Sequence, residues 1–221
     1  MTVTDISPRR KSKVAITLSP PPPQNLVGAE YEGEKLLIDK TIAARCNIAK
    51  GVALTLDDIN QLIYVSESFR AKQRAIWLLS GQDYSEKGLY EKLLKNFTPK
   101  ASAFAVAQML ERGYVNDKNF ATKLLEKFKS NNLSKRQISV KLMQKGISKE
   151  IIDSVLKNED VKDTDFERAL EIIKTKYIKK LGTKEDRQKT FTALMRRGFL
   201  SEDIKKAIKY FENSCFEEEI Y

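Results

Sequence analysis

The chain has 221 residues, of which 41% are hydrophobic, and this is enough to build a packed core. Lys and Arg outnumber Asp and Glu by 40 to 30, so the net charge is +10 and the surface favours polyanionic partners such as nucleic acid. Histidine is absent, which removes the commonest general base and metal ligand at neutral pH and disfavours an enzyme.

The two cysteines, Cys46 and Cys215, have no metal-ligand spacing, and free thiols in a reducing compartment are favoured. The basic run Arg9–Lys11 precedes an alternating segment rather than the continuous apolar stretch of a signal peptide. No segment approaches the roughly 20 apolar residues that span a bilayer. We therefore expect a cytoplasmic protein that has no membrane contact, cofactor or metal.

Residues 1–60 predict a small mixed segment. Val14, Ile16 and Leu18 alternate with polar or smaller residues, which indicates a half-buried strand over residues 13–18. Four prolines at residues 20–23 end that strand in a loop, because proline cannot continue a hydrogen-bonded ladder. A second strand near residues 35–38 and a short helix over residues 41–46 follow.

Beyond this segment the sequence predicts helices of about 10 to 17 residues joined by short turns, and these helices repeat. Ser85, Ser134 and Thr183 are each 49 residues apart, and each stands where a helix N-cap is expected. Gly146 and Gly198 are expected to end a helix with a positive φ, and Asn96 to do so at the corresponding place in the first repeat.

The predicted fold is mainly α: three tandem three-helix repeats in an elongated array, preceded by a small N-terminal segment with short β-strands. The repeats span residues 66–113, 115–158 and 163–213, and residues 214–221 form an acidic tail. Arg187 stands where the 49-residue offset predicts an apolar residue, so the second helix of the third repeat is expected to be longer or rotated. Stacked repeats offer an extended surface suited to a long, repetitive partner.

The candidate binding residues are basic. Residues 168–209 hold thirteen Lys or Arg against five Asp or Glu, so the positive charge is concentrated in the last repeat. Such side chains can contact phosphates or an acidic protein surface without reading base edges, and the alternative is an ordinary solvated helix face. The set comprises Lys135, Arg136, Lys141, Lys145, Lys176, Lys179, Lys180, Lys189, Arg196, Arg197, Lys205 and Lys209.

The aromatic residues add little to this site. Trp77, Phe104 and Phe128 are among several that fall on or beside apolar helix stripes, so core packing is favoured over base stacking. Acidic pairs such as Asp57 and Asp58 stand at expected helix starts, where the helix dipole explains them without catalysis. No phosphate loop, nucleophile elbow or metal-binding constellation is present, so we expect no catalytic residues.

Four segments carry a family resemblance: residues 90–94 (YEKLL), 111–117 (ERGYVND), 141–146 (KLMQKG) and 196–199 (RRGF). In order and spacing, over roughly residues 66–213, they resemble the RecX family. The resemblance implies a monomeric modulator, generally an inhibitor, of the RecA recombinase in DNA repair, recombination and the SOS response. It also implies binding in the groove of the recombinase filament, with contacts to single- or double-stranded DNA that are independent of sequence.

Two other classes stay open. A free-standing, sequence-independent nucleic-acid-binding module would bind naked DNA tightly, because basic helices of a three-helix unit can enter a groove. A general helical-repeat adaptor would recognise only protein and show little salt sensitivity, with its basic faces serving solubility.

Overall fold

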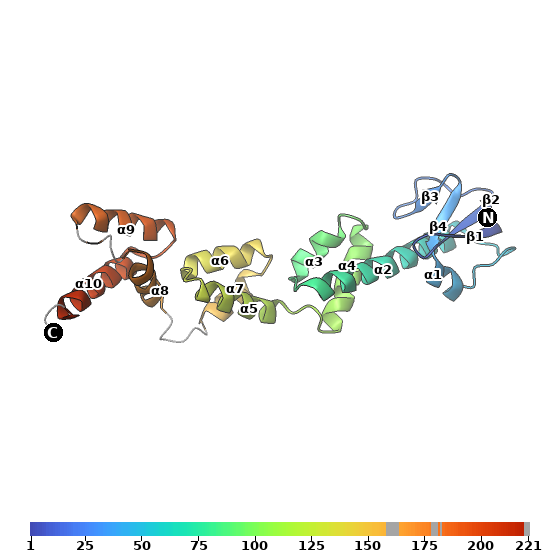
Figure 1. The fold of residues 1–221 in the computed structure, drawn as a ribbon. Coiled ribbons are helices and arrows are strands. Elements are labelled where there is room, and N and C mark those ends of the chain that lie inside the picture. Colours follow the sequence, from blue (N-terminus) through green and yellow to red (C-terminus); the bar gives the residue numbers. More distant parts are fainter. Residues whose placement is uncertain (158–163, 178–180, 182, 219–221) are drawn as a thin grey trace. The chain divides into compact units, whose positions relative to one another are not determined.

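The structure is a computed structural model that describes residues 1–157, 164–177, 181 and 183–218, with side chains described as far as residue 213 (Figure 1). Its internal contacts define two compact units, Met1–Val115 and Asn116–Tyr221, and each is described by itself. Helices dominate both units, and a small sheet lies near the N-terminus. The predicted mainly α class, with short N-terminal strands, is confirmed.

The sheet has four antiparallel strands in the order β1-β2-β4-β3. β2 (Lys13–Ser19) and β4 (Lys35–Asp39) are the two predicted strands. The edge strands β1 (Thr2–Arg9) and β3 (Glu30–Glu32) were not predicted. β1 buries only Val3 and contains Pro8, which an edge strand tolerates, so it lacks the alternating pattern by which a strand is recognised.

A short helix, α1 (Lys40–Arg45), leads to α2 (Leu56–Gly81), whose 26 residues exceed the predicted helix length and run through the expected boundary between residues 60 and 66. A capping box starts α2: the Asp58 N–H donates to the Thr55 hydroxyl, and the Thr55 N–H donates to the Asp58 carboxylate. No glycine or proline interrupts the helix before Gly81. Within the described residues, no helix is both long and apolar enough to cross a membrane.

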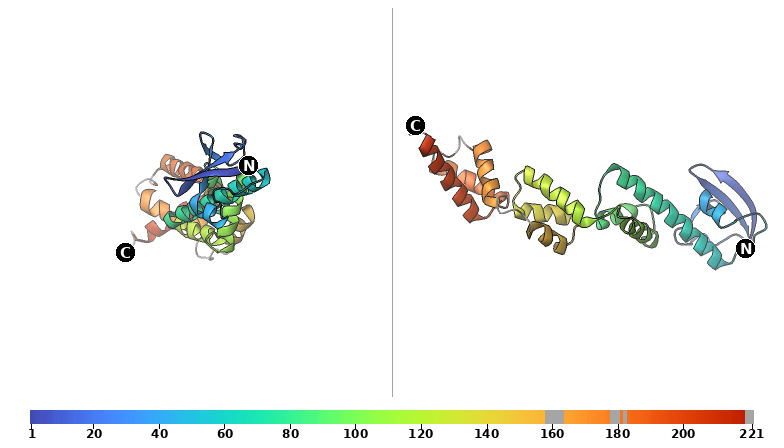
Figure 2. Two further views of the ribbon diagram at one scale, coloured as in Figure 1. Left: turned by 90° about the vertical axis from the view of Figure 1, so that its right-hand side faces the viewer. Right: turned by 90° about the horizontal axis from the view of Figure 1, so that it is seen from below.

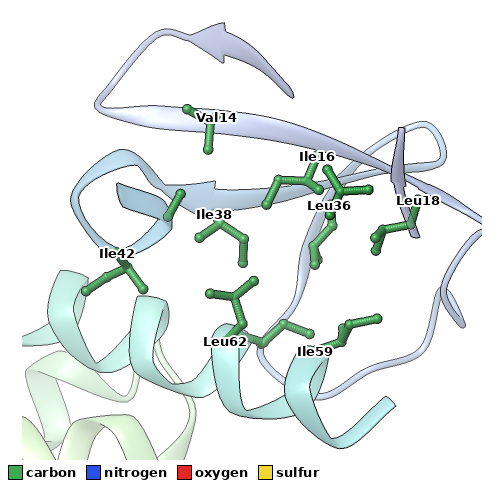
Figure 3. Close-up of a cluster of buried hydrophobic side chains, with 11 residues drawn as sticks. Val14, Ile16, Leu18, Leu36, Ile38, Ile42, Ile59 and Leu62 are labelled. Atoms are coloured by element: carbon green, nitrogen blue, oxygen red, sulfur yellow. The ribbon is translucent and has the colours of Figure 1, made fainter. Parts of the chain in front are cut away.

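The two halves of α2 belong to different cores. Ile59 and Leu62 point from its first half towards Ile16, Leu36 and Ile38 of the sheet (Figure 3). The second half packs with α3 (Glu86–Leu93) and α4 (Pro99–Glu111), as Figure 1 and the right-hand view of Figure 2 show. That second core contains Ala71, Ala75, Leu78, Leu89, Leu93 and Met109. One continuous helix therefore joins the sheet to the first helical group.

The second unit contains two further helical groups, each with its own core. α5 (Asp117–Ser130), α6 (Lys135–Gln144) and α7 (Lys149–Lys157) form one group. The other group consists of α8 (Asp165–Ile172), which continues into the π-helical turn η1 (Ile173–Tyr177), and of α9 (Lys184–Arg196) and α10 (Ser201–Glu218). α9 has 13 residues against 10 in α6, so the expected lengthening of this helix is confirmed.

The predicted caps are largely confirmed. Ser85, Ser134 and Thr183 are the N-caps of α3, α6 and α9, and each hydroxyl accepts a backbone N–H three residues on. Gly198 has a φ of 78°, as expected for a residue that ends a helix. The expectation for Asn96 was wrong, because its φ is not positive. The N–H groups of Asn96 and Phe97 both donate to the Leu93 carbonyl, so the helix end needs no left-handed residue.

Two aromatic residues expected in the core lie at the surface. Trp77 on α2 is 61% exposed, and the Arg74 guanidinium lies 4.1 Å from the centre of its ring. Phe104 on α4 is exposed as well and meets Tyr64 edge to face. Both residues stand next to the apolar stripe in sequence, but α2 and α4 turn their alanines inward, so the larger side chains face outward.

Candidate functional site

A hydrogen-bonded junction holds the start of α6 against the end of α9. The Ser134 hydroxyl, which accepts the Gln137 N–H at 3.3 Å, also donates to the Arg197 carbonyl at 2.7 Å. The next residue, Gly198, packs so closely that a Cβ there would lie 2.9 Å from the Ser134 oxygen. The N-cap of one helix is therefore also a contact between two helical groups.

Asp165 holds the start of α6 from the side of α8. Its carboxylate accepts the Lys135 N–H at 2.9 Å and lies 3.2 Å from the guanidinium of Arg168, a buried residue. Burial raises the pKa of Asp165, an effect that the Lys135 N–H and the Arg168 charge oppose and that the nearby Asp203 reinforces. The carboxyl is thus a partly desolvated acceptor, and it fixes α6 relative to α8.

An open groove with a volume of about 450 Å³ lies between α6 and the end of α9. Val140 and Met195 give it an apolar surface, and they are 47% and 44% exposed. Among the described residues, no carboxylate lines it. We call it the α6/α9 groove, and its lining residues are Arg136, Gln137, Val140, Lys141, Gln144, Met195, Arg196 and Gly198.

Three cations line the α6/α9 groove: Arg136 and Lys141 from α6, and Arg196 from α9. All three side chains are exposed, and none forms an ion pair within the part of the chain that the structure describes. The Lys141 ammonium lies 5.8 Å from the centre of the Phe128 ring. A guanidinium group can bind a carboxylate or phosphate through two parallel hydrogen bonds. The groove can therefore receive an anionic group beside an apolar one.

The other predicted binding residues lie elsewhere. Lys135 begins α6 and Lys145 caps its C-terminus, while Arg197 caps α9 and is half-buried at the junction. The remaining described members are exposed but do not line the α6/α9 groove: Lys176 in η1, Lys189 on α9 at 3.8 Å from Asp186, and Lys205 and Lys209 on α10. Lys179 and Lys180 lie outside the described residues.

The sequence did not predict the apolar part of the groove. Arg136, Val140 and Gln144 are each four residues apart and therefore share a face of α6. This spacing was the one signal in the sequence that places the apolar Val140 beside the basic Arg136. The contact between Ser134 and Arg197 joins residues 63 positions apart, and no local pattern indicates it. Met195 therefore could not be placed beside Val140 from the sequence.

The antiparallel sheet, the recurring three-helix groups and the basic groove between two of them define a helical-repeat protein with a small N-terminal sheet. The family model described as "RecX, third three-helix domain" matches residues 163–208. The regulatory protein RecX of Caldanaerobacter subterraneus is 33% identical over 162 residues, which are 73% of this chain and 80% of that relative. The chain belongs to the RecX family.

Two further comparisons agree with this membership. The regulatory protein RecX of Clostridioides difficile is 29% identical over 181 residues, covering 80% of this chain and 85% of the relative. A crystal structure of regulatory protein RecX matches with a TM-score of 0.63 at 18% identity, over 93% of this chain and 98% of the other. The structural match supports the fold.

Proposed function

We propose that this protein acts in the cytoplasm as a regulator of DNA repair and recombination. It binds the filament that a RecA-type recombinase forms on DNA and inhibits the ATPase, the extension and the strand exchange of that filament. Membership of the RecX family supports this role, since the relatives are named regulatory proteins. The observation that carries the proposal is the α6/α9 groove, where three cations from two helical groups surround an apolar surface.

The groove suits an acidic surface of the recombinase or a phosphate of the bound strand. Arg136 and Arg196 approach from different helices, so one anionic group can contact both while Val140 and Met195 cover an apolar neighbour. The outlying cations Lys176, Lys189, Lys205 and Lys209 add sequence-independent attraction. Several weak contacts made by one chain act together through effective concentration. Binding of this kind hinders the movements of recombinase subunits that ATP turnover needs.

The test is the ATPase of a RecA-type recombinase on single-stranded DNA. The unmodified protein is expected to inhibit it. The double variant Arg136→Glu/Arg196→Glu should raise the concentration for half-inhibition at least about tenfold, because each charge-assisted contact contributes about 1.5–3 kcal/mol. The control is Lys92→Glu/Lys95→Glu, which reverses the same number of charges at exposed positions in and just after α3. It should inhibit nearly as well as the unmodified protein.

Three other results would contradict the proposal, and two of them point to a different class of protein. No change in the ATPase at saturating protein would reject the proposal. Tight, salt-sensitive binding to naked DNA without any effect on the recombinase would identify a free-standing nucleic-acid-binding module. Inhibition that is insensitive to salt and unchanged in the Arg136→Glu/Arg196→Glu variant would identify a helical adaptor that does not use the groove.

A further inference from the structure

A second pocket, separate from the α6/α9 groove, lies between the start of α8 and residues 203–213 of α10. Its volume is about 590 Å³. Lys206, Tyr210 and Asn213 are four and three residues apart on α10, so they share one face of that helix. We call it the α8/α10 pocket, and its lining residues are Thr164, Phe166, Asp203, Lys206, Lys209, Tyr210 and Asn213.

The pocket presents an aromatic ring that is both supported and exposed. Tyr210 is 53% exposed, and its ring centre lies 5.9 Å from that of Phe166 with an interplanar angle of 89°. This edge-to-face contact fixes the orientation of the Tyr210 ring, while more than half of the residue remains open to solvent. An oriented, exposed aromatic ring is the feature on which single-stranded nucleic acids stack their bases.

The polar groups around Tyr210 match the rest of a nucleotide. Lys206 and Lys209 are exposed and, within the described residues, form no ion pair, so both ammonium groups can contact phosphates. The Asn213 amide can donate to and accept from a base edge, and the Asp203 carboxylate can accept from a ring N–H or an exocyclic amino group of a base. An acidic peptide would use the two lysines but would leave the exposed ring without a planar partner.

We propose that the α8/α10 pocket binds one unpaired nucleotide of single-stranded nucleic acid, whose base stacks on Tyr210 while Lys206 and Lys209 contact the flanking phosphates. A paired base cannot reach the ring without first leaving its stack, so the pocket selects single strands over duplex. The inference deepens the proposed function, on which it rests for the source of the strand. It adds a contact with the base to the contacts with phosphate expected from charge.

The experiment compares two fluorescently labelled oligonucleotides of equal length by anisotropy, using the full-length protein. One is oligo(dT), and the other has abasic residues throughout, so the phosphate charge is the same and only the bases differ. The unmodified protein should bind oligo(dT) about tenfold more tightly, as expected for one base stacked on an aromatic side chain. Tyr210→Ala should lower the affinity for oligo(dT) to that for the abasic strand, and Tyr210→Phe should preserve the preference.

Two control variants separate stacking from charge and from folding. Tyr114→Ala removes another exposed tyrosine, 58% accessible, from the first unit and should leave the preference for bases unchanged. Lys206→Glu/Lys209→Glu should weaken binding of both strands alike, because both carry the same phosphates. Thermal unfolding of Tyr210→Ala and Tyr210→Phe verifies that the folded proteins are being compared.

Equal binding of the two strands by the unmodified protein would overturn the inference, and so would a preference that survives in folded Tyr210→Ala. Neither result bears on inhibition of the recombinase ATPase, which tests the proposed function separately. A preference that depends on Tyr210, found in a protein without effect on the recombinase, would support the nucleotide pocket and reject the proposed function.

Discussion

Each of the two units contains two hydrophobic cores, and the two units connect their cores by different means. In the first unit, α2 contributes Ile59 to the core under the sheet and Ala75 to the core of the first helical group. In the second unit each helical group has its own core, and the described links include hydrogen bonds made by Ser134 and Asp165. A helix backbone couples the first pair of cores, whereas a few polar groups set the geometry of the second pair. The α6/α9 groove lies beside these polar contacts, between α6 and the end of α9.

Breaking α2 should have the largest effect. Gln73 is exposed in the middle of the helix, so Gln73→Pro removes no buried side chain but loses a backbone hydrogen bond and introduces a clash, at a cost of about 3 kcal/mol or more. Hydrogen exchange followed by mass spectrometry should show lower protection in both cores of the first unit and no change in α5 to α10. The control Gln73→Ala keeps the helix. Loss of protection in only one core would show that α2 does not couple them.

Removing the Ser134 hydroxyl should have an intermediate effect. Ser134→Ala deletes both the cap of α6 and the donor to Arg197, so we expect the free energy of unfolding of the second unit to fall by about 1–2 kcal/mol. Thr183→Ala, at the corresponding exposed cap of α9, removes only contacts within its own helix end and should cost less. Denaturant unfolding measures both changes. Equal losses would mean that the bond to Arg197 adds nothing to the cap.

The smallest effect expected is a difference in pH dependence. Burial raises the pKa of Glu30 on β3, but hydrogen bonds and charge from Lys13 on β2 and Arg70 on α2 outweigh it, so the pKa lies below its ordinary value of 4.5. The ionised carboxylate therefore stabilises the first unit above that pH, and this stability is lost as the pH falls through the lowered pKa. At Asp165 the sign is reversed, because its pKa is raised and the folded state takes up the proton first.

Glu30→Gln should therefore reduce the acid sensitivity of the first unit and leave that of the second unchanged. The difference should be less than about 1 kcal/mol, because the Glu30 side chain is 40% exposed and solvent screens its ion pairs. Hydrogen exchange at several pH values between about 3 and 6, resolved by unit, measures it around the ordinary carboxyl pKa. An unchanged acid response in the first unit would show that Glu30 does not contribute to it.

Local features of the fold were predictable, and features set by distant contacts were not. The caps at Ser134 and Thr183 and the strand around Ile16 depend on neighbouring residues, so spacing and alternation indicated them. The length of α2 was missed because its apolar residues serve two cores in succession, which blurs a single stripe. In the candidate site, the sequence pointed to Arg136 and Arg196 as candidate binding residues because of their charge. Only the fold shows that they share a groove with Met195.

The position of Trp77 gives the molecule a built-in optical probe. It is the only tryptophan in the chain, and it lies in the first unit beside the Arg74 guanidinium. Fluorescence excited at a wavelength that selects tryptophan over tyrosine will therefore report on the first unit alone. A spectral shift on adding a recombinase or an oligonucleotide would reveal that the N-terminal part takes part in complex formation, because any ligand that displaces Arg74 alters the polarity around the ring.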